Sequence, residues 1–211
     1  MEAAIRVGAR AIVIKTHQGS TVDRAYLCNR HNEIVHGKMN DFTMFGGITL
    51  NRVVGGMNPR PLTWHSAWAQ RLSGFRPSRQ KNHMQKMNQD LSQCVEVVKD
   101  GKIVPELRSV LELIRDHNAV LGTAHIAPEE IFTVVEAARD MGSKKHRCNA
   151  SGMVDCSMSH EDQLRLVKDY DVILERCYAQ NMGGGKYKSN LPENLEVIRE
   201  VGYKKRAHQH R

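Results

Sequence analysis

The chain has 211 residues, enough for one ordinary domain with its own core, and 40% of them are hydrophobic while 26% are charged. These values are typical of a soluble globular protein. No apolar run approaches the ~20 residues that a membrane span needs, and the amino terminus lacks a signal-peptide pattern, so we expect no membrane partner and a cytoplasmic location. The formal net charge is +8, but only 5% of the residues are aromatic, which is few for base stacking. We therefore expect no nucleic-acid partner.

The first strong signal along the chain is a buried strand that ends in polar residues. Residues 1 to 8 read as the end of a helix with Gly8 as its C-cap. Residues 11 to 14 are apolar and rich in β-branched side chains, which favours a parallel strand covered on both faces. Ligands bind at the carboxyl ends of such strands in α/β sheets and barrels. Lys15 and His17, which follow at once, are therefore candidate functional residues.

The same order of features returns at residues 118 to 131. A short apolar run ends in His125, and Pro128 and Glu129 then begin a helix. A single histidine at a strand end is more often a cap or a partner of a neighbouring carbonyl. Two histidines at equivalent positions, His17 and His125, favour a shared site.

Between these two histidines the sequence predicts a helix, a strand, a loop and a second helix. The first helix begins at Ser20 or Thr21 and runs to about His31, with one side formed by Val22, Ala25, Tyr26 and Asn29. The strand covers residues 42 to 50, and its Gly46-Gly47 pair indicates a close backbone approach or a bulge. The loop covers residues 55 to 59, and the second helix residues 61 to 72.

The second half of the chain carries the clearest periodic patterns. The expected elements are a hairpin around Asp100-Gly101, helices over 105–114, 128–142, 159–168 and 192–201, and a strand over 172–178. Gly142 and Gly202 are expected to end two of these helices, and Ser159 with Asp162 resembles a capping box.

Two segments interrupt the alternation of strands and helices. Residues 73 to 81 and 144 to 152 stand where buried strands are due, yet both are basic and polar, so we expect the strands to be lost there. A basic tail, residues 204 to 211, likewise stands in place of a last strand. Local reading-frame changes in the gene would explain both the lost strands and the excess positive charge.

Several motifs together resemble a known family. GARAIVIKTH, STVDRAYL, FGGITLN followed by GGMNP, DGKIVPEL, TAHIAPEEI and VILERCY are similar to amidohydrolase-related (β/α)8 proteins, which are metal-dependent hydrolases. The resemblance covers most of residues 2 to 203. It implies an α/β fold, an incomplete (β/α)8 TIM-barrel-like domain over residues 1 to 203, with parallel strands alternating with helices. The first and last strands would be missing, because the family's first-strand His-x-His would lie upstream of Met1 and the tail replaces its last-strand aspartate.

The resemblance also implies a site at the carboxyl ends of the strands. His17 and His125 become candidate ligands of a divalent metal, zinc in the first place and manganese in the second. Lys15 would orient substrate or stabilise negative charge, and Glu175 would face the barrel mouth as a catalytic carboxylate or pair with a lysine. Asn51 and Asn58 lie in loops that would face the site, either as turn and cap residues or as substrate ligands.

The expected function is that of a metal-dependent hydrolase, in which metal-activated water attacks a C–N or C–O bond of a small-molecule substrate. The missing ligand motifs argue for reduced activity. Two alternatives remain: a non-catalytic binding or assembly protein, such as a homo-oligomer that covers the open sheet edges, and an inactive fragment of such a hydrolase.

Overall fold

The computed structural model describes residues 1–16, 19–37, 41–60, 72–74, 95–123, 126–148, 158–175 and 191–202. The described helices are α1 (Glu2–Arg6), α2 (Val22–His36), the 3-10 helix η1 (Arg52–Val54), α5 (Pro105–Asp116), α6 (Pro128–Asp140), α7 (His160–Lys168) and α9 (Leu191–Val201). The described strands are β1 (Ala11–Val13), β2 (Thr43–Phe45), β3 (Gly47–Thr49), β4 (Leu72–Gly74), β5 (Val98–Lys99), β6 (Lys102–Ile103), β7 (Val120–Gly122), β8 (His146–Cys148) and β9 (Ile173–Leu174).

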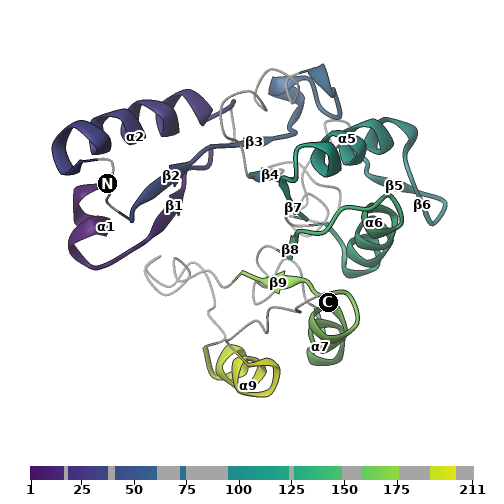
Figure 1. Ribbon diagram of the computed structural model, residues 1–211. Coiled ribbons are helices and arrows are strands. Elements are labelled where there is room, and N and C mark those ends of the chain that lie inside the picture. The colour runs from purple at the N-terminus through teal and green to yellow at the C-terminus, as the bar shows by residue number, and fades with distance from the viewer. Residues whose placement is uncertain are drawn as a thin grey trace, which may run out of the picture.

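Parallel strands follow one another in space in the order in which they occur along the chain. Strand β1 pairs with β2, and a second sheet has the order β3-β4-β7-β8-β9. Figure 1 shows these five strands in one row, with α5, α6 and α7 along one side of it. This is the order that successive βαβ units produce. The protein is thus an α/β protein whose described strands form short parallel pairs and one antiparallel hairpin, without closing into a barrel.

Gly46 separates β2 from β3 and allows the backbone of α2 to approach the sheet. A Cβ atom on Gly46 would lie 2.5 Å from the Cα and 2.7 Å from the nitrogen of Val22. The predicted close approach at the glycine pair is therefore confirmed. Only Gly46 stands between β2, which pairs with β1, and β3, which pairs with β4, so the chain passes from one sheet to the other where α2 begins.

Thr21, the N-cap residue of α2, joins three segments through one hydroxyl. Its Oγ1 donates to the carbonyl of Ile14 at 2.7 Å and accepts from the N–H of Gly47 at 3.0 Å. Farther along α2, the side-chain amide of Asn29 donates to the Met44 carbonyl at 2.8 Å and accepts from the Met44 N–H at 2.7 Å. Side chains of α2 thus fix both the end of β1 and the middle of β2.

Among the described residues, the buried apolar side chains form two clusters. The larger one contains eighteen buried described residues: Ile48, Leu50, Val97, Leu107, Val110, Leu111, Ile114, Ala119, Leu121, Ile126, Ile131, Val134, Val135, Ala138, Cys148, Met158, Leu166 and Val172. The smaller one contains Ala25, Phe42 and Met44, with α1 and β1 side chains packed against it. Gly46 lies between Met44 of the smaller cluster and Ile48 of the larger.

The elements with strong periodic patterns match their predictions. The expected apolar positions of α5, from Leu107 to Ile114, and those of α6, from Ile131 to Ala138, are all buried. The hairpin forms between β5 and β6, with Asp100 at φ 50° and Gly101 at φ 73°, as a two-residue primed turn requires. Ser159 caps α7 by accepting from the N–H of Asp162 at 3.0 Å.

Helix α2 differs from its prediction in length and in the residues that it buries. It continues to His36, five residues beyond the predicted end at His31. Tyr26 is 43% exposed, although the sequence places it on the buried side, and Asn32 is buried instead. Asn32 reaches inward because its side-chain amide donates to the Phe42 carbonyl at 3.1 Å, a contact with the sheet that apolar periodicity does not register.

Two strands expected to be lost are present. Strand β4 (Leu72–Gly74) lies between β3 and β7, and β8 (His146–Cys148) lies between β7 and β9. Three residues with a neighbour on each side suffice for each strand, because backbone groups make the ladder whatever the side chains are. In β8 His146 is 3% exposed and Cys148 fully buried, so the basic surroundings conceal a short inward-facing pattern. The prediction of lost strands over 73–81 and 144–152 was therefore wrong at residues 73, 74 and 146–148, while residues 75–81 and 149–152 lie outside the described ranges.

Helices α6 and α7 meet through a cluster of aromatic and charged side chains. Tyr170, just beyond α7, donates its hydroxyl to Glu136 of α6 at 2.5 Å, and its ring packs edge-on against Phe132 with centroids 5.5 Å apart. Arg139 lies over the Tyr170 ring and Arg165 over the Phe132 ring, at 5.3 and 4.7 Å. The hydrogen bond to Glu136 is the main cause that raises the pKa of Tyr170 above its usual value.

We expect Gly46→Ala to lower the free energy of unfolding by about 1–3 kcal/mol, the usual range for an overpacked site, because its Cβ would meet the backbone of Val22. Urea unfolding measures this change. Gly19→Ala is the matched control, since a Cβ at Gly19 meets nothing within 4 Å. Equal effects of the two substitutions would contradict the close approach.

The raised pKa of Tyr170 predicts a loss of stability in alkali. The folded state favours the neutral phenol, so its contribution is complete below the unfolded pKa of about 10 and disappears as the pH rises through the higher folded pKa. We expect the stability difference between the wild type and Tyr170→Phe to be constant from pH 7 to 9 and to shrink above pH 10 in urea titrations. In a Glu136→Gln background this dependence should weaken, because the carboxylate is the main cause of the raised pKa, and an undiminished dependence would assign it to another group.

Candidate functional site

Lys15 and Glu175 come together although they are 160 positions apart in the chain. Lys15 lies two residues beyond β1, and Glu175 directly follows β9. The Nζ atom of Lys15 is 3.4 Å from Oε1 of Glu175. The sequence leaves two roles open for Glu175, facing the barrel mouth or pairing with a lysine. The structure shows the pairing, and the lysine is Lys15, the other candidate catalytic residue.

The backbone around Lys15 is held on both sides. The Ile14 N–H donates to the Phe45 carbonyl at 2.8 Å, which continues the β1–β2 pairing. The Ile14 carbonyl accepts from Thr21, and the Thr16 carbonyl accepts from Thr49 Oγ1 at 2.6 Å. Since both threonines are buried, the peptide groups that flank Lys15 are fixed while its long side chain extends to Glu175.

Glu175 is positioned by the edge of the sheet. Its N–H donates to the Cys148 carbonyl at 2.8 Å, so the β8–β9 pairing extends one residue beyond β9. The Cys148 side chain is fully buried in the larger core cluster, which anchors β8 under this contact. The carboxylate therefore projects from the carboxyl edge of the last described strand of the row.

The Lys15–Glu175 pair is partly open to solvent. The side chains are 29% and 27% exposed, and the 3.4 Å separation is longer than the 2.7–2.9 Å of a strong charge-assisted hydrogen bond. Such a pair contributes little to stability. Its opposite charges and its place at the carboxyl edge make it suitable for binding and polarising a polar ligand.

The two candidate asparagines occupy a turn. Asn51 precedes η1, and its carbonyl accepts from the N–H groups of Val54 and Gly56 at 3.0 and 2.9 Å. The side-chain oxygen of Asn58 accepts from the Arg60 N–H at 3.0 Å, as in an Asx turn. These contacts agree with the interpretation of both asparagines as turn and cap residues.

The two candidate metal ligands, His17 and His125, lie outside the described residues. The positions before them are described. Thr16 accepts from Thr49, and the fully buried Thr123 follows β7 with a hydroxyl that has no hydrogen-bond partner among the described residues. Within the described ranges, no group of three or more histidine, cysteine, aspartate or glutamate side chains is arranged to hold a metal ion.

Sequence reasoning missed the three threonines at this edge. Thr21 and Thr49 fix the loop that carries Lys15, and the buried Thr123 is the first residue after β7. The available signal was a polar hydroxyl residue next to a strand end, which is common in turns. It therefore does not distinguish a side chain that supports a site from an ordinary loop residue.

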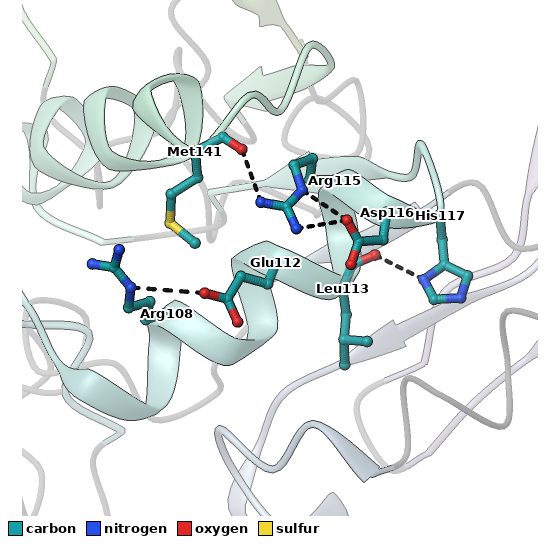
Figure 2. A network of polar contacts seen from close by, with 7 residues as sticks. All are labelled: Arg108, Glu112, Leu113, Arg115, Asp116, His117 and Met141. Carbon is teal, nitrogen blue, oxygen red and sulfur yellow. Dashed lines mark hydrogen bonds and ion pairs between the residues drawn. The ribbon is translucent and has the colours of Figure 1, made fainter.

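Charged residues with altered proton affinity also occur at the end of α5, in a network remote in sequence from the pair (Figure 2). Arg115 contacts Asp116 at 2.7 Å and donates to the Met141 carbonyl at 3.3 Å. The hydrogen bond between the two side chains raises the pKa of Arg115 and lowers that of Asp116. His117 Nδ1 donates to the Leu113 carbonyl at 2.9 Å. Because these carbonyls terminate helices, we assign the network to helix capping.

Thr49→Val should lower the free energy of unfolding by about 1 kcal/mol, because it deletes the partly buried hydrogen bond to the Thr16 carbonyl. Thr49→Ser retains the hydroxyl and should recover most of this loss. Thr43→Val, at an exposed position of the adjoining strand β2, is the matched control in the same urea titration. If Thr43→Val is as costly as Thr49→Val, the Thr49 hydroxyl does not support the loop.

Comparisons with known proteins give one positive result. No curated protein and no solved structure matches the chain. Among the described helices, none combines the length and apolar character needed to cross a membrane. The model of one protein family, however, matches residues 1–175. The chain therefore belongs to the family of unknown function DUF6282.

Proposed function

We propose that this chain is a metal-dependent hydrolase of the amidohydrolase-related type that acts on a small molecule. The observation that carries the proposal is the contact between Lys15 and Glu175, from the carboxyl ends of β1 and β9. Both strands run parallel to their described neighbours, β1 to β2 and β9 to β8, and the carboxyl edge of a parallel sheet is where α/β enzymes place their chemistry.

The order of the strands supports an incomplete (β/α)8 arrangement. Every described pairing within the row is parallel, and neighbours in space are neighbours in the chain apart from the β5–β6 hairpin. A barrel needs this order, because each βα unit is placed beside the preceding one. The contact between the ends of β1 and β9 is also what a sheet curved toward closure would produce.

The residues of the pair have complementary roles in this proposal. Lys15 offers a fixed positive charge that orients a polar substrate and stabilises negative charge as it develops at the scissile group. Glu175 offers a carboxylate that takes and returns a proton during attack by water. Thr21 and Thr49 act through the backbone to hold Lys15 in place, so they are positioning residues.

The metal part of the proposal rests on His17 and His125. Imidazole nitrogens suit zinc, and an ion at this edge would supply Lewis acidity for the hydrolytic step. Glu175 is the one candidate carboxylate that the described residues bring to this edge, and its partner there is Lys15. Because a tight catalytic zinc site usually has three protein ligands, the two histidines require a third donor to complete the set.

The test is the metal content of purified protein. We expect near-stoichiometric zinc or manganese by elemental analysis, and its loss in both His17→Ala and His125→Ala, because each removes a ligand. His160→Ala is the matched control, since His160 lies on α7, where it contacts Glu200 at 2.7 Å. Retention of metal by both site variants, or equal loss in the control, would overturn the assignment of the site.

A further inference from the structure

We propose that Lys15 is the binding residue for an oxyanion, the carboxylate or phosphate group of the substrate, and that Glu175 occupies this position until the ligand displaces it. The proposal rests on the proposed function for the location of the site, and it adds the class of substrate. It follows from the geometry of one ion pair at the carboxyl edge of the sheet.

The two members of the pair are held differently. Lys15 stands between two carbonyls that accept from the buried hydroxyls of Thr21 and Thr49 at 2.7 and 2.6 Å. Glu175 follows β9, a strand of two residues at the end of the row, and its backbone is bonded to Cys148 of β8. Both backbones are thus held by hydrogen bonds, so exchange requires only the Glu175 side chain to move away from the ammonium group.

The pair is also accessible and loosely made. Both side chains are more than a quarter exposed, so a small anion can reach the ammonium group without unfolding the edge. An incoming oxyanion at 2.7–2.9 Å would lie closer to the ammonium group than the carboxylate of Glu175, which is 3.4 Å away. Exchange therefore replaces a long contact within the chain by a short one to the ligand.

The simplest alternative is that the pair only ties the two strand ends together. Removing either partner would then cost a similar amount of stability, and neither change would alter the affinity for anions. Exchange predicts instead that the two substitutions change the affinity in opposite directions. The sign of the effect of Glu175→Gln distinguishes the two cases.

The experiment is a titration of metal-free protein, prepared over a chelating resin, with inorganic phosphate and separately with acetate at constant ionic strength and pH 7. The readout is the NMR signal of the Lys15 ε-carbon in lysine-labelled protein, identified by its disappearance in Lys15→Met. For Lys15→Met, the affinity is followed by calorimetry. The anion that binds more tightly identifies the recognised group as a phosphate or a carboxylate.

We expect Lys15→Met to lower the affinity for the preferred anion about tenfold or more, because the charge is lost while the aliphatic stem remains. Glu175→Gln should raise the affinity about two- to fivefold, because it removes the competing carboxylate while preserving shape. Thr49→Val should weaken binding and Thr49→Ser should restore it, because the hydroxyl fixes the backbone of Lys15.

Asp41→Asn is the matched control for net charge. Arg10 and Asp41 form a similar pair, 3.3 Å apart, just before the amino ends of the neighbouring strands β1 and β2, and both side chains are at least 80% exposed. Asp41→Asn raises the net charge by the same amount as Glu175→Gln, so it should leave the affinity unchanged. Equal increases in the two variants would reduce the effect to general attraction and overturn the proposal, as would unchanged affinity in Lys15→Met.

The outcome is separable from that of the proposed function. Anion binding is measured without metal, so a chain that binds no zinc can still show the opposite effects of Lys15→Met and Glu175→Gln. Conversely, a chain with stoichiometric metal and no anion response at Lys15 would retain the hydrolase assignment and lose the substrate class.

Discussion

The hydroxyl of Thr21 is the contact on which the arrangement of this protein depends most directly. It is fully buried, and it bonds the end of β1 to the start of β3 at the point where α2 begins. The backbone returns the contact, since the Thr21 N–H donates to the Gly47 carbonyl at 3.1 Å. The backbones of three segments meet here, and their N–H and carbonyl groups need polar partners such as this hydroxyl. Buried backbone groups that remain unpaired are costly. The residue that fixes this junction also fixes the loop that carries Lys15.

A second constraint is the order of the strands. Each helix returns the chain to the amino edge, so every parallel strand presents its carboxyl end on the same side. Polar residues that follow successive strands are thereby collected along one edge, even when they are far apart in the sequence. Lys15 and Glu175 are the outcome, since they follow β1 and β9, which belong to different described sheets, and still form a pair. The family match agrees in extent with this unit, because it ends at residue 175.

How much of the fold can be predicted depends on how each element obtains its stability. Helices α5 and α6 bury apolar side chains at helical spacing, and the β5–β6 turn needs residues that accept positive φ, so both are visible in the sequence. Strands β4 and β8 are short and are stabilised by ladders on both sides, and their polar neighbours conceal them. Lys15 was found because strand ends are informative, whereas Glu175 was placed within a strand over 172–178 and in fact directly follows the shorter β9. The geometry of the pair was not predictable, because nothing in the sequence states that β1 and β9 approach each other. The threonines that support Lys15 were missed because their bonds are made to the backbone.

The smaller core cluster has a consequence for the dynamics of the site. Three buried described residues, with the side chains of α1 and β1 around them, hold the first part of the chain, whereas eighteen hold the larger cluster. Leu27 and Ile34 of α2 are 65% and 78% exposed. Burial of apolar side chains therefore stabilises the first part of the chain less than the number of its apolar residues implies. Segments with few buried contacts open locally at a lower free energy than the rest of a protein, and their amide hydrogens exchange sooner. Lys15 belongs to this weaker unit, while Glu175 is tied to the stronger one through Cys148. The Lys15–Glu175 pair therefore connects the part of the chain around the smaller cluster to the part around the larger one. A ligand that binds both residues would slow the local opening of the part around the smaller cluster.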